Sequence, residues 1–452
     1  MMNTKKSRTI RWLSVALVLL TLVSFSFSVS YAEPASKDKA NYILLYCLST
    51  DTMLYEKNTD MPLDPGYTAQ MMTALLALEY DPDLNKTVTL FPNLLTSWDF
   101  PQDYRAYTYY GFQKGATVLV KDLLAAMMLE NSTAAATLLA ATIGGSVENF
   151  VEMMNARALE LGMEHTVFTN PTGIASSSAT STLQDLFKLT TLLYQNSRYM
   201  DLASAPSFQL ANQAKAYTRN YLIGKWFVGE EEKFYYDAKA TGMKTDSAFD
   251  RNQKRKTTMV IATAKENDGN HYLAMVMGGQ GEYEAYNVAK DFFKWGSTDF
   301  RSLKVIAREK LYKHLPVDGG DRTSQVPIFP EKDMTAFLPS SVTLDDITYK
   351  YSLTQKELEA PLEYGTKVGE IQAFVGDKMV ASCNLIVGQN LAQSKDSQMY
   401  GVFGSILLSP FVLIGLFILI LYMLIKVGFF VWALSRLRKF LKHNKNKKRI
   451  EK

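Results

Sequence analysis

Apolar and polar residues change their spacing several times along this 452-residue chain. Asn41 to Leu48 is an apolar run that predicts a strand, and residues 257–264 and 271–277 are β-rich runs joined through Asp268-Gly269. The Asp-Gly pair between two such runs is a strong hairpin signal. Helical periodicity fills the region between these strands. Strands at both ends with helices between them predict one α/β domain, residues 41–300, whose two ends share a sheet.

The helical region divides into several predicted helices. One begins after Pro65, and a long apolar helical stretch from Asp122 to Ile143 is broken near residues 130–133. Ser146 is a suitable N-cap for the next helix, which Gly162 ends. The remaining predicted helices are Leu183–Tyr194 and Gly281–Trp295.

From about residue 302 the helical periodicity disappears and short alternating runs replace it. Lys367–Val375 and Met379–Val387 are two such runs, and Gly376-Asp377 joins them as a turn. We therefore predict a small all-β domain over residues 301–388.

The first residues have the composition of a secretory signal peptide. Lys5, Lys6, Arg8 and Arg11 precede an apolar run from Trp12 to Val29. Ser30-Tyr31-Ala32 then provides small residues at the cleavage positions, so we predict removal after Ala32. An uncleaved membrane anchor is the alternative interpretation, because the apolar run is long.

The C-terminal region predicts a membrane anchor. Val402 to Ile425 contains no charged residue and, at about 1.5 Å per residue, forms a helix of roughly 36 Å, enough to cross a bilayer. A strongly basic tail follows, and the positive-inside rule places it in the cytoplasm with the preceding domains outside. Its charge predicts contact with anionic lipid headgroups. The predicted organisation is a signal peptide (1–32), a leader (33–40), an α/β domain (41–300), a β-rich domain (301–388), a linker (389–401), a transmembrane helix (402–425) and a basic tail (426–452).

The formal net charge of +4 is concentrated at the two ends of the chain. Without them the ectodomain carries more acidic than basic residues, which argues against a nucleic-acid partner. Cys47 and Cys383 lie in apolar alternating runs and are expected to be buried small hydrophobes rather than a disulfide. The histidines are scattered singly, without metal-ligand spacing. We predict no metal and no cofactor.

Several spaced segments resemble the serine D-alanyl-D-alanine carboxypeptidases, the low-molecular-weight penicillin-binding proteins. They are Tyr55–Asn58, Pro65–Glu79, Asp122–Leu124, Gly162–Gly173, the 257–279 hairpin, Ala360-Pro361 and Gly365–Gly369. The resemblance implies a β-lactamase/DD-peptidase-like domain, with an antiparallel sheet and a helical lobe, followed by the family's β-rich domain. It also implies a serine-type acyl transfer on D-Ala-D-Ala peptides at the outer face of a bacterial cytoplasmic membrane.

The family's first motif, S-x-x-K at a helix start, lets a lysine take the proton of a serine nucleophile. Tyr67 and Gln70 occupy these two positions here. A phenol is a bulky, poor nucleophile and an amide is no base. We expect Tyr67 to be a packed aromatic residue and Gln70 a solvated helix residue. Ser36-Lys37-Asp38-Lys39, a literal S-x-x-K in the leader, is interpreted as accidental.

The other two motifs have also changed. The S-x-N positions correspond to Asn131, Ser132 and Thr133, with a one-residue shift of register left open. Lys244-Thr245-Asp246 resembles K-T-G, the edge strand whose lysine and hydroxyl bind the substrate carboxylate, but Asp246 replaces the glycine. That side chain would obstruct peptide addition to the strand, and its charge would oppose a carboxylate. Lys244 and Thr245 are interpreted either as a remnant anion site or as surface residues.

We therefore predict a catalytically degenerate, membrane-anchored family member that binds a stem peptide of the cell wall or, preferably, an envelope protein partner. One alternative is an active carboxypeptidase with an atypical site that uses Ser132 or an unrecognised nucleophile. A second alternative is a structural spacer that holds a folded domain away from the membrane.

Overall fold

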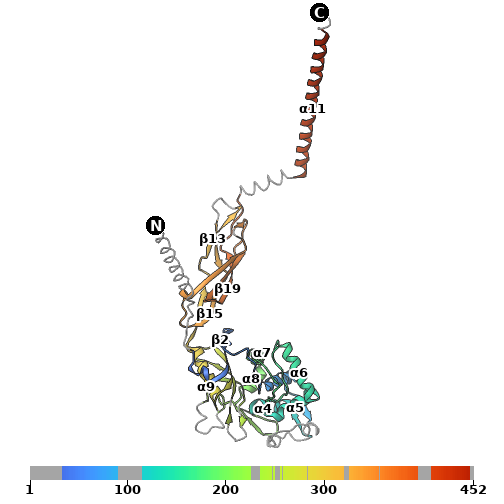
Figure 1. Ribbon diagram of the computed structural model, residues 1–452. Coiled ribbons are helices and arrows are strands. Elements are labelled where there is room, and N and C mark those ends of the chain that lie inside the picture. Colours follow the sequence, from blue (N-terminus) through green and yellow to red (C-terminus); the bar gives the residue numbers. More distant parts are fainter. Residues whose placement is uncertain are drawn as a thin grey trace, which may run out of the picture. The chain divides into compact units, whose positions relative to one another are not determined.

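A computed structural model of the chain describes most of its residues (Figure 1). The described ranges are 33–89, 115–224, 235–246, 248–249, 255–256, 258–281, 283–319, 325–355, 357–394 and 409–447. The predicted signal peptide, much of the predicted linker and the start of the predicted transmembrane segment lie outside them. The chain divides into two compact units, of which the first contains residues up to 303 with 336–343 and the second contains 304–335 and residues from 344 onward.

The first unit is built on a five-stranded antiparallel sheet in the order β2-β1-β11-β10-β7. The N-terminal strand β1 pairs with β11 of the predicted hairpin, which confirms that the two ends of the domain share one sheet. The strand β7 lies at an edge and pairs only with β10 in this sheet. The strand bounds are β1 Ala40–Cys47, β2 Thr52–Lys57, β7 Ala240–Thr245, β10 Met259–Lys265 and β11 His271–Gly279.

Both faces of this sheet are covered because successive strand residues point to opposite sides. Leu44 and Met275 face the core that contains the helices of the lobe, whereas Ile43 and Val276 face the core beneath α9 (Glu284–Thr298). The apolar faces of all central strands are therefore buried, which explains why they read as almost continuous apolar runs.

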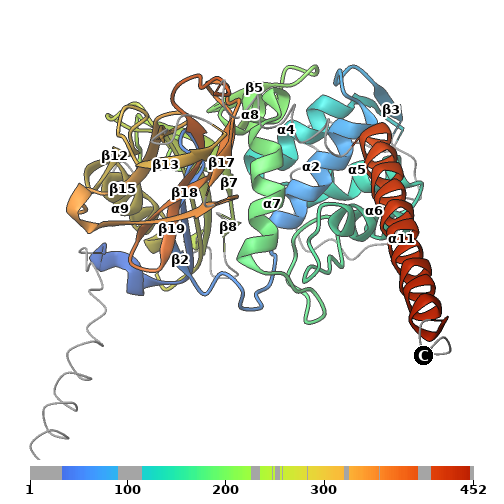
Figure 2. The same ribbon diagram turned by 90° about the horizontal axis from the view of Figure 1, so that it is seen from above.

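The helical lobe packs around α2, which is buried from Thr68 to Leu78 and so has no solvent-facing side. Figure 2 shows α2 among the helices α4, α5, α6 and α7. Asn131 adopts a left-handed conformation between α4 and α5, which confirms the break predicted near residues 130–133. The helix bounds are α2 Thr68–Tyr80, α4 Val120–Glu130, α5 Thr133–Gly144, α6 Val147–Glu160, α7 Leu183–Tyr194 and α8 Ser197–Ala203.

Smaller elements complete this unit. The expected polar leader contains a short 3-10 helix, η1 (Ala35–Lys39), which packs against α9 and buries Ser36. Three short antiparallel pairs are β3 Thr87–Thr89 with β4 Thr117–Leu119, β5 Ser207–Gln209 with β6 Lys215–Tyr217, and β8 Ala248–Phe249 with β9 Arg255–Lys256.

The second unit contains most of the predicted all-β domain, with a six-stranded sheet in the order β16-β18-β19-β14-β13-β17, whereas residues 301–303 and 336–343 belong to the first unit. β18 and β19 form the predicted hairpin, in which Gly376 at the turn has a positive φ of 57°. Cys383 in this sheet and Cys47 in β1 are both buried free thiols. The bounds are β13 Lys313–Asp318, β14 Gln325–Pro330, β16 Ile347–Leu353, β17 Leu358–Glu359, β18 Lys367–Val375 and β19 Lys378–Val387; β12 Phe300–Ile306 pairs with β15 Met334–Pro339, and η4 spans Leu344–Asp346.

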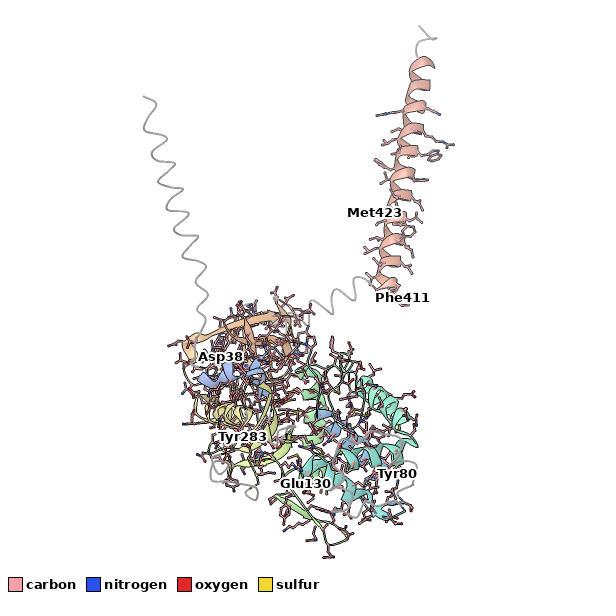
Figure 3. All side chains as sticks on the ribbon, turned by 60° about the horizontal axis from the view of Figure 1, so that its bottom comes forward. Asp38, Tyr80, Glu130, Tyr283, Phe411 and Met423 are labelled. Carbon is pink, nitrogen blue, oxygen red and sulfur yellow. The ribbon has the colours of Figure 1, made fainter. Side chains whose placement is uncertain are left out.

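The C-terminal helix α11 runs from Pro410 to Lys447 and is apolar enough over Pro410–Lys439 to cross a membrane. Its large apolar side chains, including Phe411 and Met423, point away from the helix into open surroundings (Figure 3). The helix continues without interruption past Lys426 into the basic region, beyond the predicted end of the transmembrane segment at Ile425.

Candidate functional site

The turn before α2 is held by a close backbone contact. Tyr67 is the N-cap residue of α2, and its ring is partly buried against the lobe core. Gly173, at a positive φ of 78°, lies so close that a Cβ there would come within 2.6 Å of the Gly66 carbonyl oxygen. The Asn170 side chain accepts from the amides of Thr172 and Gly173 and so fixes this loop. Only glycine satisfies both the conformation and the space at position 173.

Gln70 lies in the first turn of α2 and is completely buried. Its Nε2 donates to the Thr172 carbonyl at 2.8 Å, and its Oε1 accepts from Lys244 Nζ at 2.8 Å. The prediction of a solvated Gln70 is therefore wrong. The physical reason is that α2 is the central helix of the lobe, so each of its faces meets protein rather than water.

Lys244 is also buried, with only 1% of its surface exposed, although it lies on the edge strand β7. It pairs with Ile261, which faces the helical lobe, so strand alternation directs Lys244 to the same side. Its Nζ donates to four oxygens: Asn131 Oδ1 (2.6 Å), Gln70 Oε1 (2.8 Å), Met127 O (3.0 Å) and Met128 O (3.3 Å). The interpretation of Lys244 as a surface charge is therefore wrong.

Burial lowers the pKa of Lys244 well below its ordinary value of 10.5, and the nearby positive charge of Arg219 lowers that pKa further. Arg219 lies 3.9 Å from Glu130, a residue at the end of α4 (Figure 3). The two carbonyl oxygens around Lys244 belong to the last turn of α4, where helix carbonyls lack intrahelical donors and carry the negative end of the dipole.

The three positions that correspond to S-x-N have separate structural roles. Asn131 ends α4 and offers its Oδ1 to Lys244. Ser132 is the N-cap of α5, where its Oγ accepts from the amide of Ala135 at 3.2 Å, and it is 2% exposed. Thr133 is the first residue of α5, and its carbonyl accepts from the hydroxyl of Thr137. Of these three, Asn131 is thus the residue that bonds directly to Gln70 and Lys244.

Asp246 turns toward the start of β10. Its carboxylate accepts from the amides of Thr258 (2.9 Å) and Met259 (2.8 Å) and from the Thr258 hydroxyl. Burial raises the pKa of Asp246, and these hydrogen bonds oppose the rise. Thr245, the preceding residue, is buried opposite Val260 in the same strand pair. The aspartate therefore stabilises the junction between β7 and β10, a role that the sequence pattern did not indicate.

The literal S-x-x-K of the leader forms no nucleophile and base pair. Ser36 and Lys39 lie in η1, and Lys39 Nζ is 3.2 Å from a carboxylate oxygen of Glu284. The Lys39 amine thus pairs with an acidic side chain of α9, and Ser36 Oγ has no hydrogen-bond partner among the described residues.

Comparisons with known proteins cover nearly all of the chain between residues 29 and 393. A family model described as D-alanyl-D-alanine carboxypeptidase matches residues 29–281, and one described as penicillin-binding protein 5, C-terminal domain, matches residues 300–393. D-alanyl-D-alanine carboxypeptidase DacA of Haemophilus influenzae is 23% identical over 407 residues, which is 89% of this chain and 96% of the relative. DacC of Escherichia coli is 24% identical over 385 residues, which is 84% of this chain and 90% of the relative.

Solved structures show the same fold. Penicillin-binding protein 5 from Haemophilus influenzae aligns with a TM-score of 0.55 at 23% identity, over 81% of this chain and 100% of that structure. The carboxypeptidase DacD from Francisella tularensis aligns with a TM-score of 0.57 at 16% identity, over 80% of this chain and 96% of that structure.

Proposed function

Because this chain belongs to the D-alanyl-D-alanine carboxypeptidase family, we propose that it is a membrane-anchored member that has lost the peptidase reaction and acts by binding. The family membership itself confirms the resemblance that the sequence motifs predicted. The loss of chemistry and the binding role are the proposal, and they rest on the residues at the three motif positions.

The observation that carries the proposal is the replacement of the serine and lysine by Tyr67 and Gln70. Acyl transfer of this type needs a nucleophile and a base that takes its proton. A neutral amide has no basic lone pair, and Gln70 already uses both ends of its side chain in hydrogen bonds to Thr172 and Lys244. Ser132, the serine among the positions that correspond to S-x-N, serves as a helix cap.

The third motif supports the same conclusion. The lysine that would meet a substrate carboxylate donates instead to four protein oxygens. Asp246 occupies the glycine position and adds a side chain to the end of the edge strand. The bonds of Lys244 disfavour a D-alanyl-D-alanine peptide at β7, so we favour an envelope protein over a stem peptide as the bound partner. The Asp246 carboxylate bonds to the start of β10, so the predicted obstruction of the free edge does not support this preference.

The proposed location is the outer face of the cytoplasmic membrane, with α11 spanning the bilayer and the basic tail inside. The apolar surface of α11 and the basic residues that follow support this orientation. A spanning helix with a charged tail can also contact other membrane proteins, which fits a partner in envelope assembly or division. Cysteine substitutions in the tail, labelled with a membrane-impermeant maleimide, test the orientation, and labelling in intact cells would contradict it.

Labelling with a fluorescent β-lactam tests the loss of chemistry. The full-length protein in detergent is expected to remain unlabelled, with penicillin-binding protein 5 from Haemophilus influenzae treated in parallel as the reference protein. Circular dichroism before and after the reaction controls for folding. Covalent, stoichiometric acylation of the wild-type protein would overturn the proposal and favour an active enzyme with an atypical site.

A pull-down from solubilised envelopes, with the full-length protein as bait, tests the binding role. The matched control is the chain without residues 41–300. Recovery of the same proteins by both baits would assign the interaction to the β-rich domain and membrane helix, as the spacer alternative requires.

A further inference from the structure

We propose that Lys244 is an internal cross-link that ties the edge strand β7 to the helical lobe, in place of a role in ligand binding. We call its four acceptors, Gln70 Oε1, Asn131 Oδ1, Met127 O and Met128 O, the Lys244 cage. If the cross-link were absent, the proposed function would lose the support of Lys244, whereas its argument from Tyr67 and Gln70 would be unchanged.

The Lys244 cage gathers atoms from parts of the chain that are far apart in sequence. Gln70 belongs to α2, the two methionine carbonyls belong to the end of α4, and Asn131 follows α4 directly. Lys244 lies on β7, between 113 and 174 residues away from the side chains it contacts. These contacts link the edge of the sheet to two helices of the lobe.

The hydrogen-bonding capacity of the lysine is fully used. A lysine ammonium has three N–H groups, and four oxygens lie between 2.6 and 3.3 Å from Nζ. A ligand carboxylate could bind only by displacing one of these buried oxygens and leaving it without its donor, which is unfavourable. The cage therefore closes the group to external anions.

Gln70 supplies the cage with a neutral side chain that accepts a hydrogen bond from Lys244. Its amide accepts from Lys244 at one end and donates to Thr172 at the other. A lysine at position 70, as in S-x-x-K, would remove the Oε1 acceptor and bring a second positive charge next to Lys244. The charged groups nearby are Arg219, its partner Glu130, and Asp246 two residues along the strand. Glu130 and Asp246 are engaged by Arg219 and by β10, so neither is bonded to Lys244.

A double-mutant cycle on the full-length protein in detergent tests the cross-link. We expect Lys244→Met and Gln70→Met each to lower the melting temperature by about 5–10 °C, because each leaves buried groups without partners. The double variant is expected to fall by clearly less than the sum, since it removes both partners of the bond. Lys265→Met, at an exposed position of β10, provides the control and should combine additively with Gln70→Met. Additive effects of Lys244→Met and Gln70→Met would overturn the inference. If one of the single variants does not fold, a double variant that does fold would support it.

Chemical rescue provides a second test. Lys244→Ala removes the side-chain atoms beyond Cβ, and propylammonium matches those atoms in length and donors. Propylammonium should raise the melting temperature of Lys244→Ala and leave the wild type and Lys265→Ala unchanged, at matched ionic strength. The alcohol 1-propanol, of similar size but with a single donor, should rescue less. Equal rescue by both compounds, or no rescue by propylammonium, would contradict a cross-link made by several N–H groups.

Discussion

Two lysines at opposite ends of the strand β7 differ in burial, in hydrogen-bond partners and in the direction of their pKa shifts. Lys244 is buried among neutral oxygens, whereas Lys239, just before β7, is partly exposed and lies 2.6 Å from the carboxylate of Glu266. Burial lowers the pKa of Lys244, and the hydrogen bond to Glu266 raises the pKa of Lys239. Lys239 thus retains its charge easily, while Lys244 stabilises the fold mainly through its hydrogen bonds.

The largest expected difference between the two lysines is in the cost of removing them. Lys244→Met should lower the free energy of unfolding by about 2–6 kcal/mol, at about 1–3 kcal/mol for each of the two side-chain acceptors, Gln70 Oε1 and Asn131 Oδ1, that lose this donor. Lys239→Met should cost less, about 1–2 kcal/mol, because the amine that it removes is partly exposed although the carboxylate of Glu266 is buried. Urea unfolding of both variants measures the difference. Similar losses of unfolding free energy in the two variants would contradict the stronger role assigned to Lys244.

The two lysines should also respond to pH with opposite signs. Because the folded pKa of Lys244 is lowered, the unfolded chain binds more protons between that pKa and 10.5. The stability of the wild type relative to Lys244→Met should therefore rise with pH in this window, by up to about 1.4 kcal/mol per pH unit. The contribution of Lys239, whose folded pKa is raised, is complete below 10.5 and is lost as the pH rises through that folded pKa.

Unfolding free energies measured at several pH values between 7 and about 11 test these signs. Differences between wild type and variant cancel the titration of buried tyrosines, whose pKa values are also raised. A relative stability that falls with pH for Lys244 would contradict the argument.

Ser132 provides a neutral polar contact beside the Lys244 cage for comparison with the charged residues. Ser132→Ala removes the N-cap of α5 and should cost about 1 kcal/mol, independent of pH. The variant should remain unlabelled by a fluorescent β-lactam, like the wild type, since the hydroxyl acts as a cap. If the wild type is labelled and Ser132→Ala is not, Ser132 is instead the nucleophile.

Salt should produce the smallest effect. Raising the salt concentration from about 0.1 M to 1 M shortens the Debye length from about 10 Å to about 3 Å. The contribution of the pair between the partly exposed Lys239 and Glu266 should fall by a few tenths of a kcal/mol, and that of the buried Lys244 cage should stay constant. Parallel urea titrations at both salt concentrations measure this, and a salt-sensitive Lys244→Met difference would count against the cage being shielded.

Much of the fold could be predicted from local patterns. The hairpin through Asp268-Gly269, the break between α4 and α5, and the alternation in β18 and β19 depend on neighbouring residues, and the structure confirms each. The two replaced positions of S-x-x-K, Tyr67 and Gln70, were also identified correctly as the start of α2.

The environment of the site could not be predicted in the same way. The contact between Gln70 and Lys244 joins residues 174 apart, and nothing in the local pattern of either residue specifies it. One sequence signal for the position of Lys244 is the predicted break near residue 130, because unpaired carbonyls at the end of a helix attract a cation. A second signal, for the burial of Gln70, is the nearly continuous apolar run of α2, since a helix that is apolar on all sides is buried on all sides.

The uninterrupted course of α11 has a mechanical consequence. Its 38 residues extend roughly 57 Å, and a hydrocarbon core of about 30 Å accommodates about half of that length. In the proposed topology, a helix standing upright from Pro410 would carry its end at Lys447 roughly 25 Å past the lipid tails, well beyond the screening distance of about 8 Å at physiological salt. The protein would then present a stiff, positively charged rod to the cell interior, and the outermost charges would be within reach of soluble acidic partners rather than of lipid headgroups.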